Sequence, residues 1–291
     1  MGSEKSVVSI VRVDDMSGSV ERAVQLAGGL GVKEGDVVVV KPNAKNQSPP
    51  GYGIVTDPRV VEACVSLAFK EGAGKVKIAD GAAYPTGAYD TYAAFQTMGI
   101  MDIAKKWDVE LVDLNGYDSL DLDVPDGLVL DWVRVGRSVI EADVVVNVPV
   151  LKTHRGTLLS ACLKNIGVGC ATREEKKRLH RLGINEGLVD VYSLVKPQFN
   201  VVDGIVALEG DGPNLPPGKA KALGLVIAGW DGLAVDAVCA AVMGFDPKKV
   251  KHLRLAHERG LGNWDLSNIE IRGEPLENVV TVFELPSTFK T

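Results

Sequence analysis

Basic residues gather in one short stretch of an otherwise acidic sequence. Between positions 152 and 181 there are eight lysines and arginines against two acids, Glu174 and Glu175. The whole chain carries 32 basic and 38 acidic residues and a formal net charge of −6, so this stretch is a local exception. A local excess of positive charge holds small anions such as carboxylates and phosphates. We therefore expect an anionic ligand at this stretch.

The same stretch holds three residues suited to chemistry, His154, Lys164 and His180. A neutral imidazole binds late divalent metals, and histidine exchanges protons near neutral pH. An unpaired ammonium is costly among the small and apolar residues of ACLKNIGVG, so Lys164 should have a partner or a function. The other two histidines, His252 and His257, lie five residues apart, which suits no ligand pair on a helix, and we expect both on the surface.

Polar residues also follow four apolar runs that we predict to be strands. They are Lys41 and Asn43 at and after the end of the run 37–41, Asp80 after 75–78, Lys152 and His154 after 143–149, and Glu209 and Asp211 after 199–206. In open α/β sheets ligands bind beyond the carboxyl ends of the strands, where helix N-termini and loops converge. These residues are therefore expected to form one site.

Short β-branched runs alternate with helical segments along the chain. The remaining strands are predicted at 7–13, 110–114 and 224–228, and the helices at 20–30, 57–71, 89–98, 100–107, 173–182, 188–196, 233–243 and 247–258. Runs such as DVVVV are apolar on both faces, as in parallel strands covered by helices. The sequence predicts an α/β fold with a doubly wound, mostly parallel sheet and helices on both faces. We expect one unit over 1–291, with a smaller C-terminal lobe from about 210–291 left open by the Pro/Gly-rich stretch 210–218.

Composition excludes several classes of protein. The chain is acidic and has no basic face interleaved with aromatic residues, so we expect no nucleic-acid partner. No apolar run reaches the roughly 18–20 residues that span a bilayer, and no signal-peptide core is present, so we expect a cytoplasmic protein without membrane contact. The four cysteines form no CxxC pair, which argues against an intrinsic iron–sulfur cluster. The P-loop and dinucleotide glycine motifs are absent.

Several motifs together resemble a known family. KPN at 41–43, VKIADG, ADVVVNVPVLKTH, LKNIGVG, VVDGIVALEGDGP and WDGLAVDAV are similar to the family called domain of unknown function 362, over nearly the whole chain. Some members of that family carry an appended ferredoxin-like segment, whose cysteines this chain lacks. The resemblance implies a shared fold and leaves open an accessory redox protein that works with a separate iron–sulfur protein.

Residues 141–180 also resemble the N-terminal domain of nickel-pincer lactate racemases. The intervals of ten residues from His154 to Lys164 and sixteen to His180 are similar to that pattern. The resemblance implies an acid/base role for His154, a covalently attached cofactor on Lys164 and nickel ligation by His180. Those enzymes have another histidine after the strand matched here by VKIAD, where this chain has no histidine, so Asp80 and Tyr84 are the candidates for that position.

The sequence favours an enzyme that acts on a small carboxylate or phosphate metabolite, racemase- or epimerase-like at most. We expect it to use nickel, another divalent metal or a lysine-tethered metallo-cofactor. The catalytic candidates are His154, Lys164, Asp80 and Tyr84; the cofactor-binding candidates are Lys164, Asn165, Lys41, Asn43 and Lys152; and the metal-ligating candidates are His180, Glu209 and Asp211. Asp231 and Asp236 are further cation candidates, although Asp236 is also consistent with an exposed or helix-terminal acid.

Two other functions remain open at this point. One is a non-catalytic carrier or sensor that binds its anion through Lys41, Asn43, Lys152 and Lys164, and the other is the accessory redox protein. For the enzyme and for the carrier or sensor, the expected partner is a small anionic ligand. The sequence also leaves open whether the protein forms an oligomer.

Overall fold

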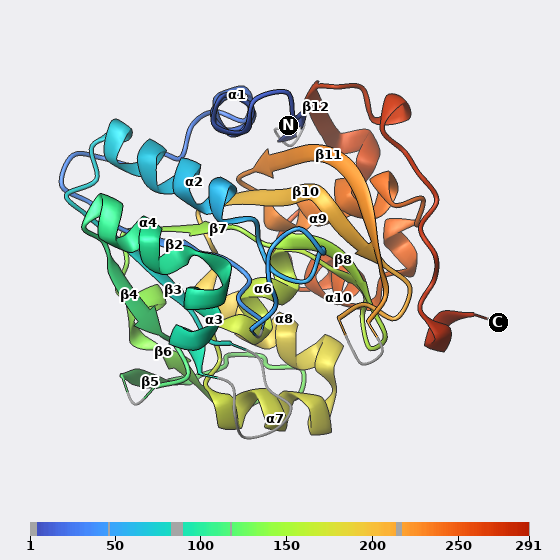
Figure 1. Cartoon of the computed structure of the whole chain (residues 1–291). Helices are drawn as coiled ribbons and strands as arrows, with labels where there is room; N and C mark the ends of the chain where they lie inside the picture. Colours follow the sequence, from blue (N-terminus) through green and yellow to red (C-terminus); the bar gives the residue numbers. More distant parts are fainter. Residues whose placement is uncertain (1–4, 46, 83–89, 117, 214–216, 291) are drawn as a thin grey trace.

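The centre of the structure, a computed structural model, is a sheet of ten strands (Figure 1). The structure describes residues 5–45, 47–82, 90–116, 118–213 and 217–290. The strands of the sheet are β1 (Ser6–Arg12), β2 (Val37–Lys41), β3 (Lys75–Asp80), β4 (Glu110–Asp113), β7 (Val144–Asn147), β8 (Val150–His154), β9 (Leu158–Ser160), β10 (Phe199–Glu209), β11 (Lys219–Gly229) and β12 (Ile269–Gly273). Their order is β12-β1-β11-β10-β7-β2-β3-β4, with β8 beside β10 and β9 beside β8. A separate hairpin joins β5 (Ser119–Asp123) to β6 (Trp132–Gly136).

The sheet is mixed but mostly parallel, as predicted. The run from β10 through β7, β2 and β3 to β4 is parallel throughout. The antiparallel pairings lie at β11, which contacts β10 and β1, and at the β8–β9 hairpin. The carboxyl ends of these five parallel strands therefore lie at one edge of the sheet, and this edge carries most of the residues discussed below.

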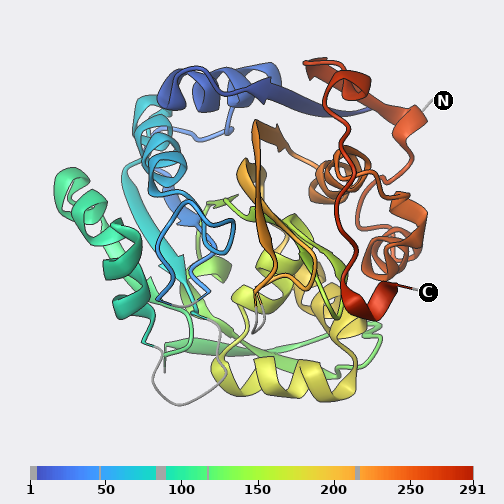
Figure 2. The same ribbon diagram turned by 45° about the vertical axis from the view of Figure 1, so that its right-hand side comes forward.

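Helices cover both faces of the sheet, which confirms the predicted α/β fold (Figure 2). The helices are α1 (Met16–Leu26), α2 (Pro58–Glu71), α3 (Thr91–Met98), α4 (Ile100–Trp107), α5 (Arg137–Ile140), α6 (Cys162–Gly169), α7 (Arg173–Leu182), α8 (Ile184–Val195), α9 (Gly232–Val242) and α10 (Lys251–Glu258). Helices α1 to α4 pack on one face, and α6, α8, α9 and α10 on the other. In β2, Val38 and Val40 belong to the first core and Val39 to the second, because successive side chains of a strand point to opposite faces.

Three local expectations were wrong. Residues 151–154 were expected in a loop, but they form most of β8, because backbone groups there pair with both β10 and β9. Helix α6 was not predicted. His252 was expected on the surface and is fully buried, because it lies on the inner side of α10 with Leu253 and Ala256; His257 is exposed, as expected.

The C-terminal region supplies part of the main sheet. Strands β11 and β12 both come from residues after 210 and pair with β1, the first strand of the chain. Within the described residues, no helix is both long and apolar enough to cross a membrane.

Candidate functional site

The carboxyl ends of β2 and β3 meet in a buried ion pair. Lys41 is the last residue of β2, and its Nζ donates to Oδ1 of Asp80, the last residue of β3, at 2.6 Å. The other carboxylate oxygen of Asp80 accepts from the backbone N–H of Ala44 at 2.5 Å. Both side chains are almost completely buried. The predicted convergence of these two strand ends is confirmed, and each charge in the pair offsets the other.

A buried carboxylate from a distant part of the chain holds the start of α6. Asp236, on α9, accepts from the backbone N–H of Cys162 at 2.6 Å and of Leu163 at 3.0 Å. Negative charge is favourable at a helix N-terminus, where backbone N–H groups lack partners within the helix. Burial raises the pKa of Asp236 to about 7. Asp236 is therefore a buried capping residue rather than an exposed acid, and it fixes the helix that carries Lys164.

Three asparagines join α6 to the strand ends. Asn165 of α6 donates to Oδ1 of Asn147 at 2.8 Å, and Asn147 donates to Oδ1 of Asn200 at 2.9 Å. The Nζ of Lys41 lies 3.4 Å from Oδ1 of Asn165. All of these side chains are buried. The position of α6 relative to the sheet is thus set by hydrogen bonds at both its start and its middle.

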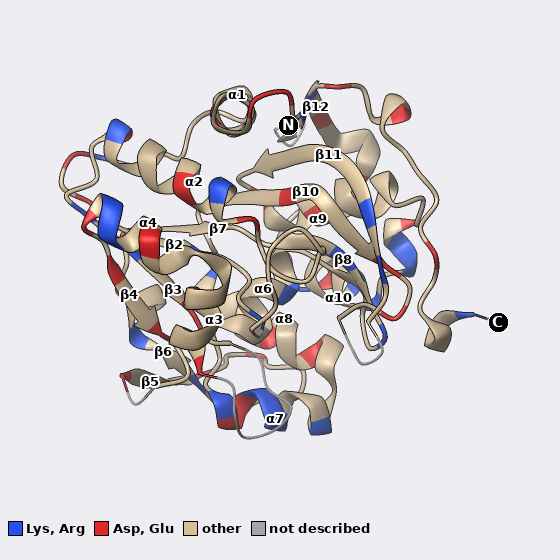
Figure 3. Ribbon diagram, viewed as in Figure 1, with Lys and Arg blue, Asp and Glu red and all other residues tan. Residues whose placement is uncertain are grey.

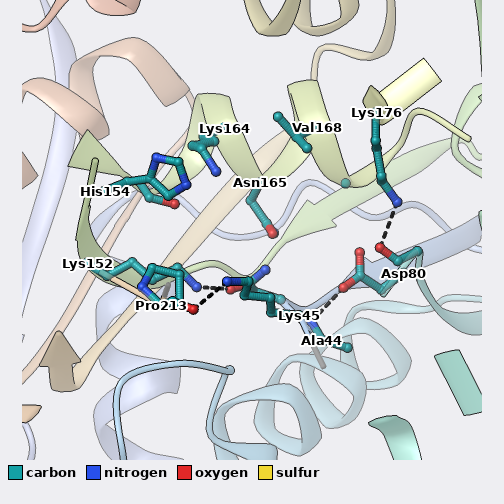
Figure 4. Close-up of a pocket in the computed structure, with 14 residues that line it drawn as sticks. Ala44, Lys45, Asp80, Lys152, His154, Lys164, Asn165, Val168, Lys176 and Pro213 are labelled. Atoms are coloured by element: carbon teal, nitrogen blue, oxygen red, sulfur yellow. Dashed lines mark hydrogen bonds between the residues drawn. The ribbon is translucent and has the colours of Figure 1, made fainter. Parts of the chain in front are cut away.

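These elements enclose a cavity of about 60 Å³ that is lined by more basic than acidic side chains (Figure 4). A cavity of this volume holds on the order of five waters or a small metabolite. Its described lining consists of Asn43, Ala44, Lys45, Asp80, Gly81, Lys152, His154, Ser160, Lys164, Asn165, Val168, Gly169, Lys176 and Pro213. Four of these are lysines and one is a carboxylate, Asp80, which is already paired with Lys41. We refer to this cavity as the lysine pocket.

Three of the four lining lysines donate to neutral oxygens. Lys152 donates to the side chain of Asn43 and to the Ile54 carbonyl, Lys176 to the Gly81 carbonyl and the side chain of Asn115, and Lys45 to the Pro213 carbonyl. A carbonyl or amide oxygen satisfies a hydrogen bond but leaves the charge of an ammonium unbalanced. Within the part of the chain that the structure describes, the pocket therefore holds cations in fixed positions without a carboxylate to balance each of them.

The pKa values of these lysines are lowered, because their charged forms are buried without balancing anions among the described residues. Burial lowers the pKa of Lys45 and of Lys176 to about 8. Burial and the nearby charges of Lys45 and Lys164 lower the pKa of Lys152 well below its usual value. Because both effects oppose the charged form, a bound anion would restore the protons of these groups.

Lys164 differs from the other three lysines. Its side chain is half-buried, and among the described residues no group accepts a hydrogen bond from its Nζ. Burial and the charge of Lys45 lower the pKa of Lys164 to about 7. A lower pKa increases the uncharged fraction of the Lys164 amine near neutral pH, and an uncharged amine is a base and a nucleophile.

His154 lines the same pocket, at the end of β8 (Figure 4). Its Nδ1 accepts from the backbone N–H of Gly156 at 3.0 Å, so in the neutral ring the proton is on Nε2. Burial and the charges of Lys164 and Lys45 lower the pKa of His154 well below its usual value. His154 is therefore a neutral hydrogen-bond donor at physiological pH.

Comparison with known proteins identifies the family. The sequence pattern described as "Domain of unknown function (DUF362)" matches residues 38–241. The chain belongs to the DUF362 family. This confirms the expected family, and the matched region includes the Lys41–Asp80 ion pair, the lysine pocket and Asp236.

One curated relative of this DUF362 chain is similar over most of its length. Thylakoid-associated protein sll1697 of Synechocystis sp. is 28% identical over 278 residues, which cover 92% of this chain and 82% of that protein.

Two solved structures resemble this DUF362 protein at 14% identity. They are the lactate racemase apoprotein from Thermoanaerobacterium thermosaccharolyticum, with a TM-score of 0.49 over 88% of this chain and 57% of that one, and a protein from Thermotoga maritima, with a TM-score of 0.46 over 84% and 58%. The chain thus spans a little over half the length of each. The expected resemblance to lactate racemase is seen again in the structure, but likeness at this level assigns no role to a residue.

The structure brings together most of the predicted site residues of this DUF362 protein and separates three. Lys41, Asn43, Asp80, Lys152, His154, Lys164 and Asn165 lie in or against the lysine pocket. His180 is exposed on α7, where its Nδ1 lies 2.7 Å from the Lys176 carbonyl. Glu209 and Asp211 line a second pocket. Tyr84 lies outside the described residues.

Among its described lining residues, the lysine pocket offers one imidazole, that of His154, and one carboxylate, that of Asp80, as metal donors. In the part of the chain that the structure describes, no three His, Cys, Asp or Glu side chains are grouped as metal ligands would be. His154 is the imidazole that lines the pocket, and its Nδ1 is occupied by Gly156. No chemical step is therefore derived through a metal or tethered cofactor, and metal ligation by His180, Glu209 and Asp211 stays a prediction.

Sequence reasoning missed two of the four pocket lysines. The sequence of the helix that carries Lys176 is mostly basic, which is typical of a solvated face, and Figure 3 shows its mixed charges. Two of its basic residues form local ion pairs, Lys177 with Glu174 and Arg178 with Glu175. Lys176 alone among the basic residues of α7 is buried, three positions before the buried Leu179. That spacing, typical of one helix face, was a signal for Lys176; nothing local distinguishes Lys45.

Proposed function

We propose that this DUF362 protein is an enzyme that acts on a small carboxylate or phosphate metabolite, with the amine of Lys164 as its reactive group. The observation that carries the proposal is the lysine pocket itself. Four lysines line a small cavity whose one described carboxylate is already paired, and one of the four has no hydrogen-bond acceptor among the described residues.

The partnered lysines suit the binding of the anion. The ammonium groups of Lys45, Lys152 and Lys176 are held by neutral oxygens, so their positions are set before a ligand arrives. Pre-organised cations in a site of low dielectric attract an anion more strongly than mobile surface lysines do. A carboxylate or phosphate would offset charges that now repel one another.

Lys164 and His154 suit the chemistry on the bound anion. The pKa of Lys164 is lowered to about 7, and a general base or nucleophile is most effective when its pKa lies near the working pH. His154 presents its Nε2–H, which can donate to an oxygen that gains negative charge during the reaction. Anion binding alone would need neither feature, and this favours an enzyme over a carrier or sensor.

The first test combines binding with proton exchange. Calorimetry with inorganic phosphate and with pyruvate measures anion binding, and proton NMR in D₂O follows the loss of carbon-bound protons from pyruvate, lactate and malate. We expect binding and exchange of at least one acid with the natural chain, and weaker binding without exchange for Lys164→Met. Exchange that is unchanged in Lys164→Met would contradict the role of Lys164. Binding with no exchange or turnover would favour a carrier, and the absence of anion binding would overturn the proposal.

A further inference from the structure

We propose that Lys164 is a nucleophile that forms an imine with the carbonyl carbon of a small 2-oxo acid. This inference rests on the proposed function and narrows it, since it names the class of substrate and the bond that forms. It is carried by three features of the lysine pocket: the Lys164 amine, which has no acceptor among the described residues, the neighbouring N–H of His154, and the surrounding fixed cations.

The charge of the pocket favours attack over simple proton removal. If Lys164 acted as a base, it would end the step as an ammonium among Lys45, Lys152 and Lys176, where positive charge is already costly. Attack on a carbonyl carbon adds no net charge to the pocket until the product nitrogen is itself protonated. A desolvated lysine next to other cations is a known means of activating an amine as a nucleophile.

The other groups match the two ends of a 2-oxo acid. The ammonium groups of Lys152 and Lys45 suit the carboxylate. The Nε2–H of His154 suits the carbonyl oxygen, which gains negative charge as the amine attacks. A cavity of about 60 Å³ has room for an acid of three or four carbons.

The step is balanced without any further reagent. A bond forms between Nζ of Lys164 and the carbonyl carbon while the carbon–oxygen double bond opens. Both protons of the amine and the carbonyl oxygen then leave as one water, which yields a neutral imine. Nothing is oxidised or reduced.

The test is chemical trapping of the imine. Borohydride delivers hydride to an imine carbon and leaves a stable secondary amine on the lysine. We would treat the full chain with pyruvate and borohydride, measure the intact mass and map the modified residue by peptide mass spectrometry. We expect one adduct per chain, located on Lys164 and lost in Lys164→Met.

The pocket and the acid both supply matched controls. Lys176 lines the same cavity and has a lowered pKa, but its Nζ donates to Gly81 and Asn115, so we expect it to stay unmodified. Lactate, which has no carbonyl group, should give no adduct. Acetone, which has a carbonyl but no carboxylate, should modify Lys164 at least tenfold less than pyruvate does.

The outcomes separate this inference from the proposed function. If calorimetry shows that pyruvate binds but borohydride traps nothing on Lys164, the imine is excluded and the proposed anion-acting enzyme remains. Equal labelling of Lys164 and exposed lysines such as Lys219, or equal labelling by acetone, would also overturn the imine. If neither pyruvate nor phosphate binds, both proposals fail. The folding of Lys164→Met is checked by its thermal unfolding.

Discussion

Two pockets of this molecule are both lined by lysines and carboxylates, but they differ in whether the charges of the lysines are balanced by carboxylates. The lysine pocket holds cations that face neutral oxygens. The second pocket, near the C-terminus, is lined by Glu209, Gly210, Asp211, Pro217, Gly218, Lys219, Glu284, Leu285, Ser287 and Lys290, and we refer to it as the C-terminal pocket. There Glu284 contacts Lys219 at 3.2 Å and Lys290 at 2.9 Å, and Glu209 contacts Lys221 at 2.8 Å.

The acid–base behaviour of the two pockets follows from this difference. In the C-terminal pocket, hydrogen bonds from Lys290 and Lys219 lower the pKa of Glu284, as expected for a satisfied carboxylate. In the lysine pocket, burial lowers the pKa of Lys164 and Lys176, as expected for cations without counter-charges. Charges that are paired with opposite charges, as in the C-terminal pocket, are part of the fold. Fixed charges that lack an opposite partner, as in the lysine pocket, indicate a place where a charged ligand can bind.

The largest expected effect is a loss of stability on removal of the Asp236 carboxylate, which fixes the helix that carries Lys164. Asp236→Ala leaves two buried N–H groups at the start of α6 without an acceptor, and we expect it to lower the free energy of unfolding by about 2–4 kcal/mol. Asp211 also accepts a backbone bond, from Ser287 at 2.6 Å, but it lies in the C-terminal pocket and is only partly buried. Asp211→Ala should destabilise the protein much less. Urea unfolding of both variants checks this; equal losses would contradict it.

The second effect concerns anion affinity. We expect Lys152→Met and Lys164→Met each to weaken phosphate binding by at least about tenfold, which corresponds to 1.4 kcal/mol. In anion-free buffer, Lys164→Met should also unfold at the same temperature as the natural chain or at a higher one. The substitution breaks no hydrogen bond to a described residue, and it removes a charge that repels Lys152. Lys219→Met in the C-terminal pocket is the matched control and should bind phosphate as the natural chain does. Calorimetry measures all three.

Much of the lysine pocket could be predicted from sequence, because its residues follow a general rule. Lys41 and Asp80 end neighbouring parallel strands, and such ends lie at one edge of a sheet. The same rule placed Glu209 wrongly, since β10 continues as an antiparallel pair with β11, and the carboxylate of Glu209 bonds Lys221 on that strand. Asp236 was missed as a cap because its contact with α6 joins residues more than seventy positions apart, and no local pattern records such a contact.

A third prediction concerns proton linkage in the lysine pocket. The pKa of Lys164 is lowered to about 7, and those of Lys45 and Lys176 to about 8. A bound anion favours the charged forms and raises these pKa values, so binding near pH 8 takes up protons. Affinity for phosphate or sulfate should therefore fall as the pH rises from 7 to 9, by up to about tenfold per pH unit for each proton taken up.

Calorimetry of sulfate binding in buffers of different ionisation enthalpy measures this proton uptake directly. Sulfate is preferred here because its charge is constant over the range. Lys164→Met should take up fewer protons than the natural chain. Binding without proton uptake would show that the pocket lysines are already fully charged, and the contrast with the C-terminal pocket would then disappear.

The smallest effect is expected in the C-terminal pocket. Lys221 pairs with Glu209 at 2.8 Å, donates to the Val282 carbonyl at 2.8 Å and lies over the ring of Phe283 at 5.0 Å. Because the pair is partly exposed and screened by solvent, Lys221→Met should lower the free energy of unfolding by only about 0.5–1 kcal/mol. Phosphate affinity and pyruvate trapping should not change. A loss of anion binding in Lys221→Met would mean that the two pockets are coupled across β10, and the carboxylates of the C-terminal pocket would then have to be counted among the groups that set the charge of the lysine pocket.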